Sequence, residues 1–124
     1  RPSHEIWLGD VGVSVAEEVN HVTAGGNYGW SILEGDRCVR PRDCQTDGLL
    51  PPVSSYDHSG GRCAVIGGAV YRGNDIPGID GLYLFGDFCS GEVWTLDRAD
   101  GEATLLTRFP GSLWHGRIRR GPRG

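Results

Sequence analysis

The stretch EEVNHVTAGGNYGW, residues 17–30, carries the strongest fold signal in the sequence. Its alternation places Glu17, Val19 and His21 on one face and Glu18 and Asn20 on the other, which predicts a β-strand. The glycine pair and the asparagine that follow accept positive φ, so they predict a tight turn. We therefore expect a strand that ends in a sharp turn before two large aromatic residues.

Two carboxylates and an amide lie one short strand upstream of this turn. Hard cations are bound by carboxylate, amide and backbone carbonyl oxygens that converge on one point. One hypothesis is therefore a cation site in this strand and turn. The alternative is a solvated strand edge followed by a packed turn.

Strands of similar length are expected along the rest of the chain. The clearest are predicted at residues 64–72, 82–87, 91–96 and 103–109, and shorter ones at 4–8 and 30–33. Residues 34–47 and 56–61 are expected to be loops, and no stretch longer than about ten residues shows helical periodicity. We expect almost no helix.

The last four predicted strands follow one another in simple up-and-down order, which is typical of one blade of a β-propeller. Residues 4–33 would supply strands of an earlier blade. The expected fold is all-β, with about two four-stranded antiparallel blades in residues 1–110. Propellers contain about 4–8 blades, so this length cannot close one. We expect a partial propeller with exposed apolar surface and a tendency to associate with itself.

Four cysteines are present, without the spacing of a zinc site. Cys38 and Cys44 bracket a short polar loop. Cys63 and Cys89 would face each other across a hairpin in which Tyr71 faces Gly81. We predict the disulfides Cys38–Cys44 and Cys63–Cys89, which are typical of an oxidising compartment; reduced structural cysteines are the alternative.

The net charge of −4 argues against general nucleic-acid binding. No apolar run approaches the roughly 20 residues of a membrane span. The sequence contains no methionine, so we expect a processed chain or a fragment, and it contains no lysine. Residues 111–124 form a separate arginine-rich tail, for which a solvated end foreign to the fold is one interpretation.

Several blocks in order resemble the glucose/sorbosone dehydrogenase family. They are IWLGDVG at 6–12, EEVN at 17–20, GNYGW at 26–30, EG at 34–35, GGAVYRG at 67–73 and GLYLFGDFCSG at 81–91. The family consists of six-bladed β-propeller quinoproteins and includes the aldose sugar dehydrogenases. With its cysteines the chain is also similar to the propeller of hedgehog-interacting protein, a binding relative.

The resemblance implies oxidation of a sugar hydroxyl with pyrroloquinoline quinone and transfer of the electrons to an external acceptor. It also implies calcium, held by the carboxylate of Glu18 and the backbone carbonyl of Tyr28, with Asn20 as a neighbour. Asn20 and Glu18 share a strand face, whereas Glu17 points to the other face and is not expected to contribute.

The chain departs from the family in three respects. The catalytic histidine of the family belongs to an earlier blade, and none of the four histidines matches it, so no catalytic residue is assigned. A lysine that contacts the quinone would lie near Cys89, but the chain has none. Arg117 and Arg119 could match an arginine pair that binds the quinone carboxylates.

Two functions follow as hypotheses. The first is part of a quinone-dependent sugar dehydrogenase, periplasmic or secreted, that is inactive as a separate piece. The second is a disulfide-stabilised propeller that binds a protein or glycan without catalysis, since a fold does not fix a function.

Overall fold

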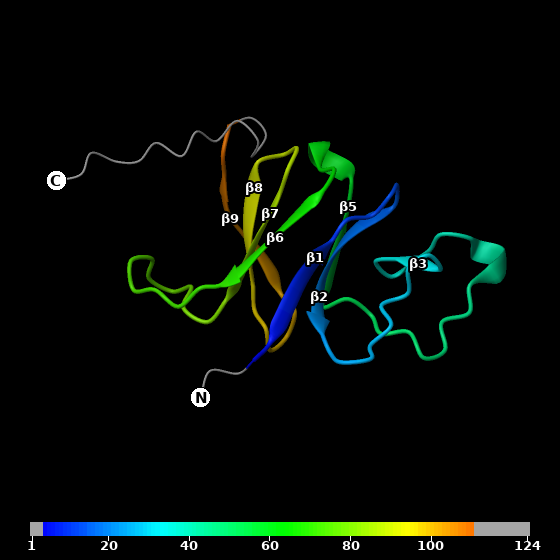
Figure 1. Ribbon diagram of the computed structural model, residues 1–124. Helices are drawn as coiled ribbons and strands as arrows, with labels where there is room; N and C mark the ends of the chain where they lie inside the picture. Colours follow the sequence, from blue (N-terminus) through cyan, green and yellow to red (C-terminus); the bar gives the residue numbers. More distant parts are fainter. Residues whose placement is uncertain (1–3, 111–124) are drawn as a thin grey trace.

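Two antiparallel sheets make up the body of the protein in a computed structural model, which describes residues 4–110 (Figure 1). The first sheet has the order β1-β2-β5, and the second has the order β6-β7-β8-β9. The strands of the first sheet are β1 (Ile6–Asp10), β2 (Ala16–Val22) and β5 (Ser54–Asp57). Those of the second are β6 (Val65–Val70), β7 (Tyr83–Asp87), β8 (Glu92–Leu96) and β9 (Ala103–Arg108).

The all-β prediction is confirmed, and so is the up-and-down order of the second sheet. The described residues contain no α-helix, only two three-residue 3₁₀ turns, η1 (Pro41–Asp43) and η2 (Ser59–Gly61). No helix among them could span a membrane. Four strands form the second sheet and three form the described part of the first, so the number of blades stays a prediction.

The expected strand at residues 30–33 is wrong. The N–H groups of Ile32 and Leu33 both donate to the carbonyl of Gly29, at 2.7 and 2.9 Å, which closes a turn where the apolar pattern suggested extended chain. Only the last residue joins a strand, in the small hairpin of β3 (Leu33–Glu34) and β4 (Arg37–Cys38). Part of the predicted loop at 34–47 is therefore this hairpin.

Strand β5 lies partly in the segment that was expected to be a loop at residues 56–61. Its sequence SSYD has little strand propensity, but it pairs with the β2 segment from Ala16 to Val19. The pairing partner, rather than the local sequence, makes this segment a strand.

The hydrophobic core lies between the two sheets. Val19 of β2 packs against a cluster from the second sheet: Val65, Tyr83, Phe85 and Leu96. The rings of Phe85 and Trp94 stack with centroids 6.2 Å apart, and Tyr56 of β5 stacks on Trp94 at 6.4 Å. This face-to-face packing is the contact that one propeller blade makes with the next.

The hairpin of β6 and β7 has the predicted register at its cysteine end. Val65 pairs with Asp87, and beyond the Gly67-Gly68 bulge the register shifts by one residue. Despite the shift, the Gly81 N–H donates to the Tyr71 carbonyl at 2.9 Å. The bulge lies where β1 approaches β6: a Cβ on Gly9 would lie only 2.9 Å from the Gly67 nitrogen.

Both predicted disulfides are present. The Cα atoms are 5.7 Å apart in Cys38–Cys44 and 5.6 Å apart in Cys63–Cys89. Both distances lie within the usual range for this bond.

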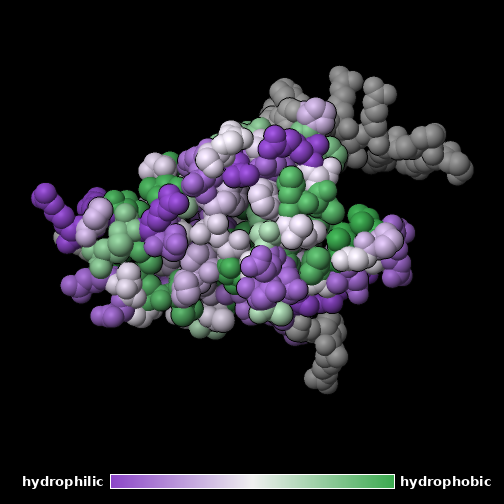
Figure 2. All heavy atoms as spheres, turned by 180° about the vertical axis from the view of Figure 1, so that it is seen from behind, coloured by the Kyte–Doolittle hydropathy of each residue, from purple (hydrophilic) through white to green (hydrophobic). Residues whose placement is uncertain are grey.

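Large apolar side chains remain exposed at several places on the surface. Figure 2 shows hydrophobic residues gathered in separate patches on the face seen from behind. On the described residues, the side chains exposed by about half or more include Ile6, Leu8, Val11, Val13, Trp30 and Phe109. Self-association of the chain remains a prediction.

Candidate cation site

Strand β2 is the middle strand of the first sheet and is covered on both faces. Its residues from Ala16 to Asn20 are all buried. Glu17 and the pair Glu18 and Asn20 lie on opposite faces, as predicted. Glu17 points towards the second sheet, and Glu18 points towards the segment around Gly35. The buried carboxylates of two adjacent residues therefore lie in different surroundings.

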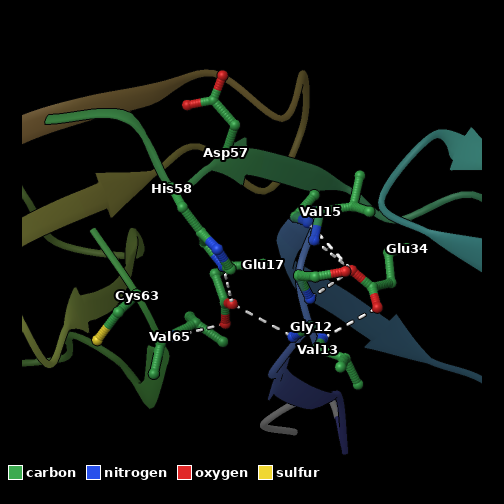
Figure 3. Close-up of polar contacts among 12 residues, drawn as sticks. Gly12, Val13, Val15, Glu17, Glu34, Asp57, His58, Cys63 and Val65 are labelled. Carbon is green, nitrogen blue, oxygen red and sulfur yellow. Dashed lines mark hydrogen bonds and ion pairs between the residues drawn. The ribbon is translucent and has the colours of Figure 1, made fainter. Parts of the chain in front are cut away.

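Glu17 joins the two sheets on the inner face (Figure 3). Its carboxylate accepts hydrogen bonds from the N–H groups of Val65, at 2.8 Å, and Gly12, at 3.3 Å, and lies 2.7 Å from Nε2 of His58. The side chain of Glu17 is completely buried, and that of His58 is 30% exposed. With these contacts, both oxygens of Glu17 are engaged within the protein.

Glu34 has a comparable structural role beside the start of β2. Its carboxylate accepts four backbone N–H groups at 2.6–3.3 Å, from residues 13, 14, 15 and 16 (Figure 3). Burial alone would raise the pKa of Glu34, but these four donors outweigh it and lower the pKa. The side chain that follows the GNYGW block thus fixes the loop that precedes β2.

Glu18 is less completely satisfied on the outer face. Its Oε1 accepts the Gly35 N–H at 2.5 Å, and its Oε2 accepts the amide Nδ2 of Asn20 at 3.1 Å. The Oδ1 atom of Asn20 is buried and has no hydrogen-bond partner among the described residues. Because a buried acceptor without a partner costs free energy, this atom points to a missing donor or cation.

Strand β1 brings a second carboxylate to Glu18. Asp10 pairs directly with Glu18 in the β1–β2 ladder, and facing residues in such a ladder lie on the same side of the sheet. Burial raises the pKa of Glu18, and the negative charges of Asp10 and Glu34 raise it further, so that the hydrogen bonds from Asn20 and Gly35 do not compensate. A cation beside Glu18 would relieve this excess of negative charge.

Tyr28 lies at the same place but uses its phenol elsewhere. The hydroxyl donates to the carbonyl of His21, at 2.7 Å, and accepts the Thr23 N–H, at 2.9 Å. These bonds close the predicted turn, in which Gly25 has φ of +74°. With Asp10, Glu18 and Trp30, Tyr28 lines a cavity of about 220 Å³.

Asp10, Glu18 and Glu34 line this cavity, and carboxylate oxygens are of the kind that calcium prefers, but those of Glu34 are bonded to backbone N–H groups. No group of three or more histidine, cysteine, aspartate or glutamate side chains in residues 4–110 is arranged to hold a metal. A calcium ion here would need amide and backbone oxygens beside Glu18. Asn20 is not among the residues that line the cavity, but its amide is bonded to the Glu18 carboxylate and its Oδ1 has no partner among the described residues. Sequence reasoning missed Asp10, which only the pairing of β1 with β2 could have revealed.

The other residues considered from the sequence do not join this cavity. Arg117 and Arg119, the predicted quinone ligands, lie outside the described residues, as does His115. His21 stacks on Trp7 with ring centroids 5.0 Å apart, and His58 pairs with Glu17. These two histidines therefore have structural contacts within the described residues.

Up-and-down antiparallel sheets packed face to face are the arrangement of neighbouring blades in a β-propeller. In the solved structures, the chain is similar to the soluble aldose sugar dehydrogenase from Escherichia coli in its apo-form. The TM-score is 0.63 and the identity 23%, over 88% of this chain and 33% of that one. This likeness supports the fold.

A family model described as glucose/sorbosone dehydrogenase matches residues 1–120, and the chain belongs to that family. It is 35% identical over 106 residues to the HIPL1 protein of Arabidopsis thaliana, covering 76% of this chain and 15% of the relative. It is 36% identical over 96 residues to the HIPL2 protein of the same plant, covering 68% and 14%. The chain thus spans about one seventh of the length of these relatives.

Proposed function

We propose that this chain is part of a quinone-dependent sugar dehydrogenase that is periplasmic or secreted. Family membership carries the proposal, and the β-propeller fold and the two disulfides are consistent with it. In such an enzyme the bound quinone takes a hydride from a sugar hydroxyl, and an external acceptor then removes the electrons. The sugar and the acceptor would be partners of the whole protein.

The part of this reaction that residues 4–110 support is the scaffold and a calcium site. Glu18 would supply a carboxylate, Tyr28 its backbone carbonyl and Asn20 its Oδ1, and Asp10 would add negative charge from β1. The single observation that favours the site is the buried Asn20 Oδ1 without a partner next to the Glu18 carboxylate. Calcium takes about 6–8 oxygens, so water would complete the shell.

The described residues do not provide a set for the quinone. The chain lacks the lysine expected near Cys89, and in the region of Cys89 the carboxylates of Asp87 and Glu92 are bonded to protein donors. Pyrroloquinoline quinone is itself a carboxylate and would need unpaired cationic donors near Cys89, where Arg62 and Arg108 are both paired with Glu92. We therefore derive no catalytic step from these residues.

A second candidate is a propeller that binds a protein or a glycan without redox chemistry. The absence of lysine and the pairing of all four cysteines in disulfides favour it. Both candidates use the same fold, so only a measurement on the whole protein separates them.

The test is a titration of the full-length protein with quinone and calcium, read by sugar-dependent reduction of a dye. A dehydrogenase reduces the dye only when sugar, quinone and calcium are all present. A well-folded protein that binds calcium but never reduces the dye would contradict the enzymatic proposal and favour the binding propeller.

Terbium tests the cation site without relying on activity. Terbium is a stand-in for calcium whose luminescence is excited through nearby aromatic rings, and Tyr28 and Trp30 line the cavity. We expect calcium to displace terbium, and we expect Glu18→Gln to remove the signal. The matched control is Glu102→Gln, which changes an exposed glutamate next to β9 of the second sheet. This variant should keep the terbium signal. Equal loss in both variants would show that the site is elsewhere.

A further inference from the structure

A second cavity, of about 430 Å³, lies between the two sheets at the end away from the cation site. It is lined by Glu5, Ile6 and Trp7 at the start of β1, by the end of β6 and Arg72, and by Tyr83. The β1–β2 register puts Ile6 opposite Val22 and Asp10 opposite Glu18, so the two sites lie at opposite ends of β1. At about 3.3 Å per residue, four residues separate them by about 13 Å.

The same cavity is also distant from the disulfide end of the second sheet. Val65 pairs with Asp87 next to Cys63 and Cys89, whereas Val70 pairs with Tyr83 at the cavity. Figure 1 shows β1 and β6 next to each other in the centre of the molecule. Their backbones touch at Gly9 and Gly67, and the cavity opens beyond this contact.

Ring stacking makes the aromatic wall of the cavity rigid. Trp7 lies between two rings, with centroids 5.0 Å from His21 and 5.3 Å from Tyr83. Tyr83 is 1% exposed, and its hydroxyl oxygen accepts the Gly68 N–H at 2.9 Å. A wall fixed in this way needs little reorganisation to receive a ligand.

The polar side chains of the cavity that can still form a hydrogen bond are donors. The carboxylate of Glu5 is engaged by Arg98 and by the indole N–H of Trp7. Arg72 has no ion-pair partner among the described residues, and it is exposed at the edge of the cavity. Tyr83 accepts one hydrogen bond and still has its own hydroxyl proton to give. An acceptor-rich anion suits such a site better than a cation.

The remaining wall is apolar and open. Ile6 is 62% exposed, and Ala69 and Val70 continue the surface along β6. A sugar ring has a C–H face that packs on such a surface. A guanidinium binds a carboxylate with two parallel hydrogen bonds.

We propose that this cavity binds an acidic sugar, with the carboxylate of a uronic acid on Arg72 and the ring against Ile6 and Ala69. The site goes beyond the proposed function, because it is separate from the calcium site and needs no quinone. It gives the whole protein a place to hold an acidic glycan at the opposite end of the sheets from the disulfide Cys63–Cys89.

The experiment is calorimetric titration of the full-length protein with glucuronate, and with glucose and acetate as separate probes. Glucuronate should bind, and glucose and acetate should each bind at least tenfold more weakly. Arg72→Gln should weaken glucuronate binding about tenfold or more by removing the paired hydrogen bonds. Arg42→Gln is the matched control, because Arg42 is also exposed but belongs to the Cys38–Cys44 loop, and it should bind as the parent does.

Several results would overturn the proposal. Equal binding of glucose and glucuronate would show that no carboxylate is recognised, and equal binding of acetate would show that no sugar ring is. Unchanged binding in Arg72→Gln, or no binding of glucuronate to the parent, would remove the site. Glu18→Gln should leave glucuronate binding intact, so a failure of the calcium proposal is distinguishable from a failure here.

Discussion

Glu17 and Glu18 are adjacent in the chain and both buried, yet their surroundings differ. On the inner face of β2, Glu17 is 0% exposed and receives hydrogen bonds from the β1–β2 loop, from β6 and from the segment after β5. On the outer face, Glu18 is 6% exposed, has another carboxylate directly across the ladder, and bonds to an amide whose oxygen is unpartnered. The inner face holds the sheets together, whereas the outer face has room for a ligand.

The difference shows that burial of a carboxylate does not by itself indicate function. Glu17, Glu34, Asp87 and Glu92 all have protein donors around them, and such groups are structural. Asp87 accepts five donors, among them the Tyr56 hydroxyl at 2.9 Å and the N–H groups of Cys89 and Ser90. Among the buried carboxylates that the structure describes, Glu18 is the one bonded to a side chain that has a buried polar atom without a partner, Asn20.

Acid should lower the free energy of unfolding more than any single substitution, because it protonates all the structural carboxylates together. The pKa of Glu92 is lowered to about 2, first by the hydrogen bonds from Arg62 and then by those from Arg108 and Ser90, against the effect of burial. The pKa values of Asp87 and Glu34 are also lowered. Since the folded values lie below the unfolded ones, this stability is present above the usual carboxylate range and is lost as the pH falls towards 2. Unfolding should therefore begin below about pH 4, as followed by circular dichroism.

On the outer face the pKa of Glu18 is shifted the other way, so calcium binding should be lost at a higher pH than the stability that the inner carboxylates supply. The pKa of Glu18 is raised, so calcium must compete with a proton that the folded state binds more tightly than the unfolded state does. Calcium affinity should rise as the pH passes upwards through this raised value, in a range where the inner carboxylates stay ionised. A calcium affinity that is flat between about pH 4 and 7 would contradict the assignment of Glu18.

Glu17→Gln should give the next largest effect. It replaces a buried carboxylate that accepts two backbone N–H groups with an amide whose NH₂ cannot accept, and each buried donor left without an acceptor costs about 1–3 kcal/mol. Glu18→Gln should change the free energy of unfolding by less than about 1 kcal/mol without calcium, since it also relieves repulsion from Asp10. Urea denaturation of both variants in EDTA measures the difference, and equal losses would refute the distinction between the two faces.

The sequence predicted this distinction in part. The alternation of valines with polar residues placed Glu17 and Glu18 on opposite faces, and the cysteine spacing and hairpin register predicted both disulfides. It could not predict β5, because SSYD becomes a strand only through its pairing with β2. Asp10 and Glu34 were missed for a similar reason: their contacts depend on segments that meet only in the folded chain.

The two disulfides also belong to different faces of the first sheet, one to the inner network and one to the segment on the outer face. Cys63–Cys89 closes a loop with a sequence separation of 26 beside Asp87, and Cys38–Cys44 closes one of 6 in the segment that covers the outer face. From loop entropy alone, removing them should cost about 3.5 and about 2.2 kcal/mol respectively. Paired cysteine-to-alanine variants, compared by thermal unfolding, measure both losses. A larger loss for Cys38–Cys44 would mean that the outer segment contributes more to folding than the inner network does.

The smallest expected effects come from two tyrosine hydroxyls, one on each face. Tyr56 donates to Asp87 at 2.9 Å, and burial followed by this hydrogen bond to a carboxylate raises its pKa, so the hydroxyl stays protonated. Hydrogen bonds to charged groups contribute about 1.5–3 kcal/mol, and Tyr56→Phe keeps the ring stacking on Phe85 and Trp94. The free energy of unfolding of Tyr56→Phe should therefore be lower than that of the parent by an amount in that range.

Tyr28→Phe should cost only about 0.5–1.5 kcal/mol, because its hydroxyl bonds to neutral backbone groups of His21 and Thr23 near the surface. The same variant keeps the backbone carbonyl that is proposed as the calcium ligand. Calcium affinity, measured by displacement of terbium, should therefore stay within about threefold of the parent value once the variant is folded. If Tyr28→Phe abolished calcium binding while Glu18→Gln did not, the phenol rather than the carbonyl would be the ligand. The cation would then lie at the turn of residues 23–28 and not beside β2.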